Sequence, residues 1–248
     1  MSQPGVAQTY QGLPAVKAEV MRTLDDLAAQ KYKIPVMELM ENAGRAVARE
    51  TACYIREKMR LEVKGTAIVV CCGRGSNGGD GLVAARALKE MGAQVFVFIC
   101  PPRKPAGPAP GLGVYPELVR INLERARSQG VAVREAGPES HLHESLDLAA
   151  VVLDAVLGTG FSGKPSGAVY HMIMEMVRSK KTVLSVDLPS GLEPNTGDRS
   201  GPAVSAAMTF TLGLPKLGLL TPQAKKYVGD LKVLDIGYPP ELIKDLFK

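Results

Sequence analysis

The fold is decided by the stretch TAIVVCCGRGSNGGDG, residues 66–81. Its first seven residues are almost all apolar and show no alternation, which is typical of a strand buried on both faces. A glycine-rich loop comes next, and a helical pattern follows over Gly81–Met91. A strand, a tight loop and a helix in this order predict one unit of a parallel α/β sheet.

The same alternation of short apolar runs and helical patterns extends outward from this stretch. Further strands are predicted at Gln94–Cys100, Val151–Leu157, Thr182–Val186, Met208–Leu212 and Leu231–Asp235. Further helices are predicted at Ala15–Lys31, from Val36 onward after Pro35, at Val114–Gln129 and at Val169–Ser179. The repetition indicates right-handed crossovers in a doubly wound, mostly parallel sheet. We expect a mobile tail over residues 1–14 and a single domain over 15–248.

Composition narrows the class of protein. Of the 248 residues 46% are apolar, only 5% are aromatic and none is Trp, so the core must be aliphatic. The net charge of +5 comes without a dense basic stripe, so we expect no nucleic acid partner. The tail has no secretory apolar segment and no run is long enough to cross a bilayer, which predicts a cytoplasmic protein. We expect reduced thiols at the four cysteines, Cys53, Cys71, Cys72 and Cys100.

The glycine-rich loop matches a dinucleotide-binding pattern, Gly73-x-Gly75-x-x-Gly78, between a strand and a helix. Glycines permit positive φ and close approach of a phosphate, and a helix N-terminus attracts anions. The alternative is a tight turn that merely requires glycine. An ordinary dinucleotide-dependent dehydrogenase is disfavoured, because the next strand ends in Cys100-Pro101-Pro102 and no acid follows to bind a ribose.

Two later strands each close on a carboxylate. Asp154 precedes a second glycine-rich loop, and Asp187 precedes the turn Pro189-Ser190-Gly191. Because ligands of such sheets bind at the carboxyl ends of strands, both carboxylates are expected to face one crevice. The alternatives are a buried cap or ion pair for Asp154 and a local turn contact for Asp187. Asn77, Asp154 and Ser190 offer the oxygen atoms that a hard cation prefers.

Together these loops resemble the NAD(P)H-hydrate epimerase family, also called the YjeF N-terminal domain family. The stretches that carry the resemblance are Met37–Gly44, Gly75–Gly81, Asp154–Gly160, Val186–Gly191 and Thr209–Gly218. The resemblance implies a three-layer αβα Rossmann-like fold, commonly in a homodimer. It implies an isomerase that interconverts the R and S epimers of hydrated NADH or NADPH (NADHX and NADPHX) in metabolite repair. A separate ATP- or ADP-dependent NAD(P)H-hydrate dehydratase would then act on the S form.

The resemblance also implies roles for particular residues. A potassium ion would be held by Asn77, Asp154 and Ser190. The dinucleotide would contact Ser76, Asn77, Gly78, Gly79 and Asp80 in one loop, and Gly158, Thr159, Gly160, Phe161, Ser162, Gly163 and Lys164 in the other. Asp187 would lie near the reacting ring. Ser76 stands where the family often has a second Asn, and neither Arg103 nor Lys104 is given a role.

A reaction hypothesis follows from the carboxylates. Loss of the hydroxyl beside the ring nitrogen would leave an iminium cation, to which water returns from the opposite face. Asp187 is the candidate acid and base, with Asp154 and its cation shaping the field. One rival is an NADP-dependent oxidoreductase, for which no Tyr–Lys or His arrangement is in place. The other is a non-catalytic dinucleotide-binding or dimerisation scaffold, which would be free to lose Asn77, Asp154 or Asp187.

Overall fold

A seven-stranded sheet forms the centre of the computed structural model, which describes residues 8–103, 114–137 and 139–246. The strand order is β5-β4-β3-β6-β7-β8-β9, and every neighbouring pair is parallel. The strands are β3 (Ala67–Cys72), β4 (Gln94–Ile99), β5 (Ala132–Glu135), β6 (Val151–Ala155), β7 (Thr182–Val186), β8 (Met208–Leu212) and β9 (Asp230–Leu234). The predicted parallel sheet is confirmed.

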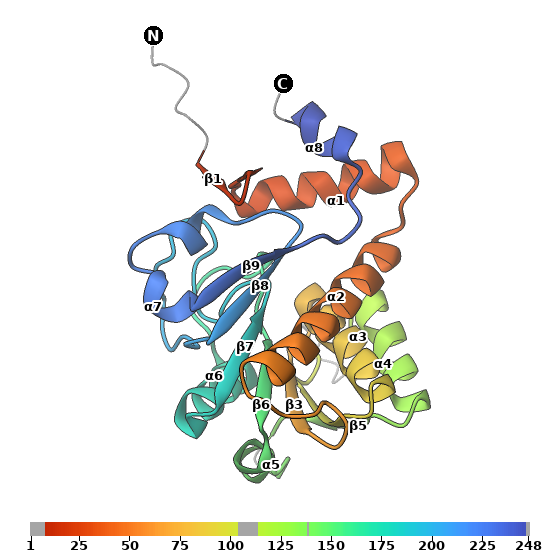
Figure 1. Ribbon diagram of the computed structural model, residues 1–248, viewed down its shortest axis with the longest axis vertical. Helices are drawn as coiled ribbons and strands as arrows, with labels where there is room; N and C mark the ends of the chain where they lie inside the picture. Colours follow the sequence, from red (N-terminus) through yellow and green to blue (C-terminus); the bar gives the residue numbers. More distant parts are fainter. Residues whose placement is uncertain (1–7, 104–113, 138, 247–248) are drawn as a thin grey trace, which may run out of the picture.

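Helices cover both faces of the sheet, which confirms the three-layer α/β fold (Figure 1). They are α1 (Ala18–Tyr32), α2 (Val36–Glu57), α3 (Ser76–Glu90), α4 (Glu117–Ser128), α5 (Leu142–Leu148), α6 (Gly167–Ser179), α7 (Lys225–Val228), α8 (Pro240–Leu246) and the 3₁₀ helix η1 (Leu217–Leu220). Helices α1 to α4 and α8 share one hydrophobic core with the sheet, whereas α5 and α6 pack in the other.

Strand β3 contributes to both cores. Ile68, Val70 and Cys72 point into the core under α2 and α3, while Val69 and Cys71 point into the core under α6. All five side chains are fully buried. Burial on both faces is therefore the physical reason for the apolar run without alternation.

Strand order reverses between β3 and β6, and this reversal positions the site. From β3 the chain runs outward to β4 and β5, then crosses back to place β6 on the other side of β3. The loops that leave β3 and β6 therefore turn to opposite faces of the sheet and leave a crevice between them. Strand β5, at the edge, was not predicted because its four residues include Arg134 and Glu135 and are mostly exposed.

The predicted tail lies partly outside the described residues, because residues 1–7 are not described. Residues 9–14 form an antiparallel pair, β1 (Thr9–Tyr10) with β2 (Leu13–Pro14). The Tyr10 hydroxyl donates a hydrogen bond to the carbonyl of Leu231 in β9, at 2.7 Å. The second half of the predicted tail therefore packs on the sheet edge, and the boundary at residue 15 stays a prediction.

The four cysteines are free thiols, and three of them are buried. Burial raises the pKa of the Cys100 thiol to about 12, and it raises those of Cys71 and Cys72 as well. These three thiols therefore act as small apolar groups of the core. Within the described ranges, none of the helices combines the length and the apolarity that crossing a membrane requires.

Candidate active site

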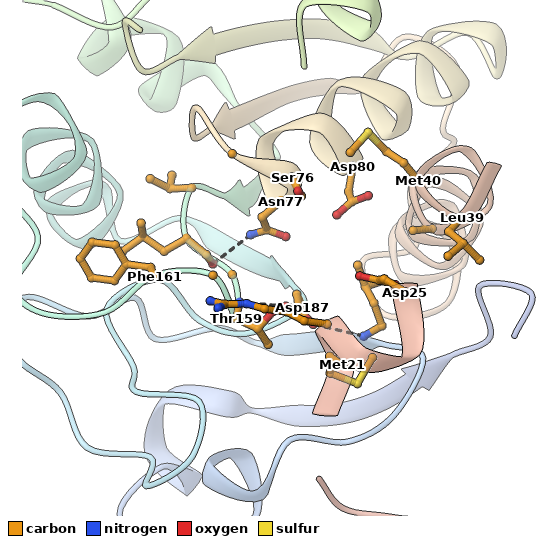
Figure 2. A pocket seen from close by; sticks show the side chains of 18 of the residues that line it. Met21, Asp25, Leu39, Met40, Ser76, Asn77, Asp80, Thr159, Phe161 and Asp187 are labelled. Atoms are coloured by element: carbon orange, nitrogen blue, oxygen red, sulfur yellow. Dashed lines mark hydrogen bonds between the residues drawn. The ribbon is translucent and has the colours of Figure 1, made fainter. Parts of the chain in front are cut away.

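A cavity of about 490 Å³ opens at the carboxyl ends of β3, β6, β7 and β8. Figure 2 shows its side chains converging from α1, α2, α3 and the strand ends. The polar lining is supplied by Arg22, Asp25, Arg74, Ser76, Asn77, Asp80, Arg103, Thr159, Ser166, Asp187, Lys216 and Tyr238. The cavity lies at the strand ends where the sequence analysis expected a crevice.

The first wall of the cavity is the start of α3. This helix begins at Ser76, so Asn77 and Asp80 lie in its first turns. The predicted helix start at Gly81 was therefore wrong, because it had placed both residues in a loop. The glycines are required by close packing: a Cβ on Gly78 would lie 2.0 Å from the Gly73 carbonyl oxygen, and one on Gly81 would lie 2.6 Å from the Ala155 Cβ. None of the glycines at 73–81 has a positive φ.

A chain of hydrogen bonds joins Asn77 to Asp154. The Asn77 amide nitrogen donates to the Leu157 carbonyl at 2.9 Å, and the Leu157 N–H donates to the Ser190 hydroxyl at 2.8 Å. The Ser190 hydroxyl in turn donates to Asp154 at 2.5 Å. The loop after β6 therefore links the three residues that were predicted to share one site.

Asp154 lies beneath the cavity and does not line it, which corrects the expectation that it faces the same open space as Asp187. It is fully buried, and burial raises its pKa above the ordinary value. Four hydrogen bonds act in the opposite direction and lower this pKa. Their donors are the Ser190 N–H, the Ser190 hydroxyl, the Ser185 hydroxyl and the Val156 N–H. All four donors are neutral, so none of the hydrogen bonds that Asp154 accepts from the described residues comes from a cationic group.

The oxygen atom of the Asn77 side chain is left without a partner among the described residues. The Asn77 side-chain oxygen is buried and has no hydrogen-bond partner among the described residues, while its amide nitrogen is fixed by Leu157. A buried, unpaired amide oxygen is costly unless something binds it. Asp154 and Ser190, which the hydrogen bonds through Leu157 link to Asn77, also carry oxygen atoms, the donor type that hard cations prefer.

Asp187 turns the chain at the end of β7 with a φ of +68°, in the left-handed region. The N–H of the next residue, Leu188, donates to the Val186 carbonyl at 2.9 Å, which closes a three-residue turn. Such turns are strained for residues other than glycine. In this conformation the carboxylate borders the cavity, where one oxygen accepts the Thr159 N–H at 3.3 Å.

Lys216 is the principal site residue that the sequence analysis missed. Lys216 lies after β8 and directly before η1. Its side chain is only 1% exposed and borders the cavity. Its ammonium lies 2.5 Å from the Asp187 carboxylate. The available signal was its position after a strand end, in the stretch Thr209–Gly218 that the analysis had already matched.

Two more carboxyl groups face the same end of the cavity. Asp80 comes from α3 and Asp25 from α1, and Figure 2 shows both pointing into the cavity. Burial, then the charges of Asp187 and Asp25, hold the pKa of Asp80 well above its ordinary value. Burial also raises the pKa of Asp25, whose carboxylate accepts the Tyr238 hydroxyl at 2.5 Å. Asp25 and Tyr238 were not predicted as site residues.

The second glycine-rich loop contributes only part of its length to the cavity. Gly158, Thr159, Gly160 and Phe161 line it, whereas Ser162, Gly163 and Lys164 do not. Gly78 and Gly79 also lie behind the wall, so a contact between these five residues and a ligand stays a prediction. At the rim, Arg103 lines the cavity, and Lys104 lies outside the described residues.

Relatives of known name resemble the chain over most of its length. An NAD(P)H-hydrate epimerase of Elusimicrobium minutum is 36% identical, covering 93% of this chain and 99% of that protein. A bifunctional NAD(P)H-hydrate repair enzyme of Thermofilum pendens is 41% identical over 94% of this chain. This chain spans only 42% of the length of that bifunctional relative.

A solved structure and a family model agree with these relatives. The crystal structure of yeast ynu0, YNL200c, superposes with a TM-score of 0.70 at 26% identity, and the match covers 83% of each chain. The model of the family described as YjeF-related protein N-terminus matches residues 36–218, which include Asn77, Asp154, Asp187 and Lys216. The chain therefore belongs to the YjeF N-terminus family, as its motifs predicted.

Proposed function

We propose that this protein is an NAD(P)H-hydrate epimerase, which interconverts the R and S epimers of hydrated NADH and NADPH. The observation that carries the proposal is the cavity at the strand-order reversal, where a helix N-terminus, a glycine-rich loop and the Asp187 carboxylate meet. The name of the Elusimicrobium minutum relative, which matches nearly end to end, supports the same activity. Loss of Asn77, Asp154 or Asp187 would have favoured a non-catalytic scaffold, and all three are present.

The cavity offers separate surfaces to the phosphates and to the hydrated ring of a dinucleotide. Ser76 and Asn77 lie in the first turn of α3, where free N–H groups and the helix dipole favour phosphate. The loop from Gly158 to Phe161 forms the facing wall. The hydrated ring would then lie towards Asp187, at the end of the cavity that carries the carboxyl groups.

The epimerisation would proceed through loss and return of water at the carbon beside the ring nitrogen. The carbon–oxygen bond breaks with its electron pair on oxygen, a proton joins the oxygen to give water, and the nitrogen lone pair forms the iminium double bond. Water then adds to the opposite face and gives up a proton. Asp187, in its protonated form, would give that proton to the leaving oxygen, and the carboxylate so formed would stabilise the cation and take the proton back from the returning water.

A potassium ion, as the family resemblance implies, would be held by Asn77, Asp154 and Ser190. The unpaired Asn77 oxygen supports such a cation. When bound, it would supply a fixed positive charge that offsets the buried Asp154 carboxylate and keeps the loop after β6 in place. Through their hydrogen bonds with Leu157, Asn77 and Ser190 would then fix the positions of Leu157 and Gly158, and so the shape of the facing wall.

The partners expected for this activity are a dehydratase and a second copy of the chain. An ATP- or ADP-dependent NAD(P)H-hydrate dehydratase would consume the S epimer, on the same chain or on another. The relative called bifunctional supports a link between two repair activities. The homodimer would be checked by sedimentation velocity.

A coupled assay tests the proposed function. The R epimer is supplied together with an S-specific dehydratase and its nucleotide, and formation of NADH is followed with and without this protein. We expect the protein to let the R form be consumed, and Asp187→Ala to slow this by roughly 10²–10⁴-fold. Binding of NADH hydrate without faster consumption of the R form would favour the scaffold instead.

A further inference from the structure

Lys216 is a buried cation whose three protons all have acceptors within the protein. The ammonium donates to Asp187 Oδ1 at 2.5 Å, to the Leu212 carbonyl at 2.7 Å and to the Thr211 hydroxyl at 3.2 Å. An ammonium has three donors and no acceptor. Every donor of Lys216 is therefore engaged, and none is left for a ligand in the cavity.

The backbone on either side of Lys216 is also fixed. Val16, just before α1, donates its N–H to the Pro215 carbonyl at 2.8 Å and accepts the Leu217 N–H at 2.9 Å. These two bonds form an isolated parallel bridge between Val16 and Lys216. The lysine is thus anchored by a segment that lies outside residues 36–218, the range of the family model.

The ion pair divides the two oxygens of Asp187 between the protein and the cavity. Oδ1 is taken by Lys216 and faces the Leu212 N–H at 3.5 Å. Oδ2 accepts only the Thr159 N–H among the described residues, at 3.3 Å, and lies against Gly158 in the cavity wall. A Cβ at Gly158 would come within 3.2 Å of Oδ2, so glycine keeps this oxygen accessible.

The strained backbone of Asp187 makes this support necessary. A left-handed turn at a residue with a side chain persists only where its surroundings hold it. The Lys216 ammonium holds the carboxylate of that residue from below. Without it, the carboxylate would be free to rotate away from the cavity or to relax with its turn.

We propose that Lys216 is the positioning residue of the site, which holds Asp187 Oδ1 so that Oδ2 faces the reacting ring. This role rests on the proposed function, because the reaction is what it would serve. A purely structural role is the competing explanation, in which the buried pair stabilises the fold and catalysis does not need the lysine. The two explanations differ in how Lys216 and Asp187 substitutions combine.

A double-mutant cycle tests the proposal with Lys216→Met, Asp187→Asn and the two together, in the coupled epimerase assay. We expect Lys216→Met to lower kcat by about 10²-fold, within the range for acid–base groups, with KM changed by less than about threefold. Lys216→Arg should recover part of kcat because it restores the cation. The double variant should be no slower than Asp187→Asn alone, since Lys216 acts only through Asp187.

Lys232→Met is the control for loss of an ion-paired lysine, because Lys232 on β9 forms an ion pair with Glu50 of α2 and does not line the cavity. We expect its activity to be unchanged. If Lys216→Met does not fold, the kcat of the double variant is compared with that of Asp187→Asn, and a slower double variant overturns the proposal. The double variant is suited to this comparison because it leaves no unpaired buried charge. A double variant slower than Asp187→Asn by the full single effect would overturn the proposal, as would wild-type kcat in Lys216→Met.

The assay also separates this proposal from the proposed function. A wild-type protein without epimerase activity overturns both. An active wild type together with independent, multiplying effects of the two substitutions overturns only the role of Lys216. An active wild type with a double variant equal to Asp187→Asn supports both.

Discussion

Asp187 and Gly213 hold the same backbone conformation at the ends of two adjacent strands. Their φ angles are +68° and +70°, and in each case the following N–H donates to the preceding carbonyl at 2.9 Å. Glycine adopts this turn without strain, whereas aspartate does so at a cost of roughly 1–3 kcal/mol. The chain accepts that cost at one of two equivalent positions, the one where a carboxylate borders the cavity.

This comparison predicts the behaviour of Asp187→Gly. The turn should persist without its strain of roughly 1–3 kcal/mol, but the buried Lys216 loses its partner at a cost of about 3–5 kcal/mol, so the free energy of unfolding should fall by about 2 kcal/mol. Adding Lys216→Met should recover most of that loss without restoring activity. Urea unfolding and the epimerase assay measure the two effects. Full activity in Asp187→Gly would show that the carboxylate has no chemical role.

Gly78→Ala should disturb the wall that is proposed to bind phosphate. Its new Cβ would meet the Gly73 carbonyl oxygen at 2.0 Å, so α3 must shift at a cost of about 1–3 kcal/mol. The matched control is Gly75→Ala, because a Cβ there meets nothing within 4 Å and its φ is −105°. The melting temperature should fall only in the first variant, and the KM for the hydrate is compared between Gly78→Ala and the wild type, because Gly75 itself lines the cavity. Equal effects in both would argue against close packing as the reason for these glycines.

The proposed cation site predicts a specific salt effect. The melting temperature should rise in KCl relative to choline chloride, by an amount equivalent to about 2.7 kcal/mol at a hundred times the dissociation constant. Asn77→Ala should abolish this difference, because it removes the buried oxygen that has no partner in the part of the chain that the structure describes. Epimerase activity should follow the same dependence. An identical response of wild type and variant to potassium would remove Asn77 from the site.

Asp80 predicts how stability depends on pH. Its pKa in the folded protein is raised, chiefly by burial, so its contribution to stability is present at low pH and is lost as the pH rises through the folded pKa. Asp80→Asn should therefore stabilise the ligand-free protein by more than about 1 kcal/mol near pH 8, and by less near pH 5. Urea unfolding at the two pH values measures this. The exposed Asp26→Asn serves as a control, and a pH-independent effect of Asp80→Asn would contradict the argument.

Much of the framework was predictable because it is encoded locally. The apolar runs predicted β7 and β8 with their observed bounds. The glycines and carboxylates that follow strand ends predicted where the crevice lies. The start of α3 was misplaced because close packing against Gly73 and Ala155, and not turn formation, requires its glycines. Packing of that kind is decided by neighbours that are distant in sequence.

The part of the site that escaped prediction consists of long-range pairs. Asp25 and Tyr238 are 213 residues apart in sequence, and Lys216 meets Asp187 across 29 residues. A lysine after a strand and an aspartate in a helix are ordinary surface residues when read alone. The position of α1 across the strand ends brings Asp25 to Tyr238, and no periodicity in the sequence reports that position. The pairing of β7 with β8 brings Lys216 to Asp187.

The most direct measurement needs no coupling enzyme. Pure R epimer of NADPH hydrate is incubated with the protein in potassium buffer, and both epimers are followed by NMR, with Asp187→Asn as the comparison. We expect the S form to appear until the ratio is constant, the same ratio to be reached from pure S, and the variant to slow this approach by roughly 10²-fold or more. An R form that persists as long as in buffer alone would show that the protein is not an epimerase.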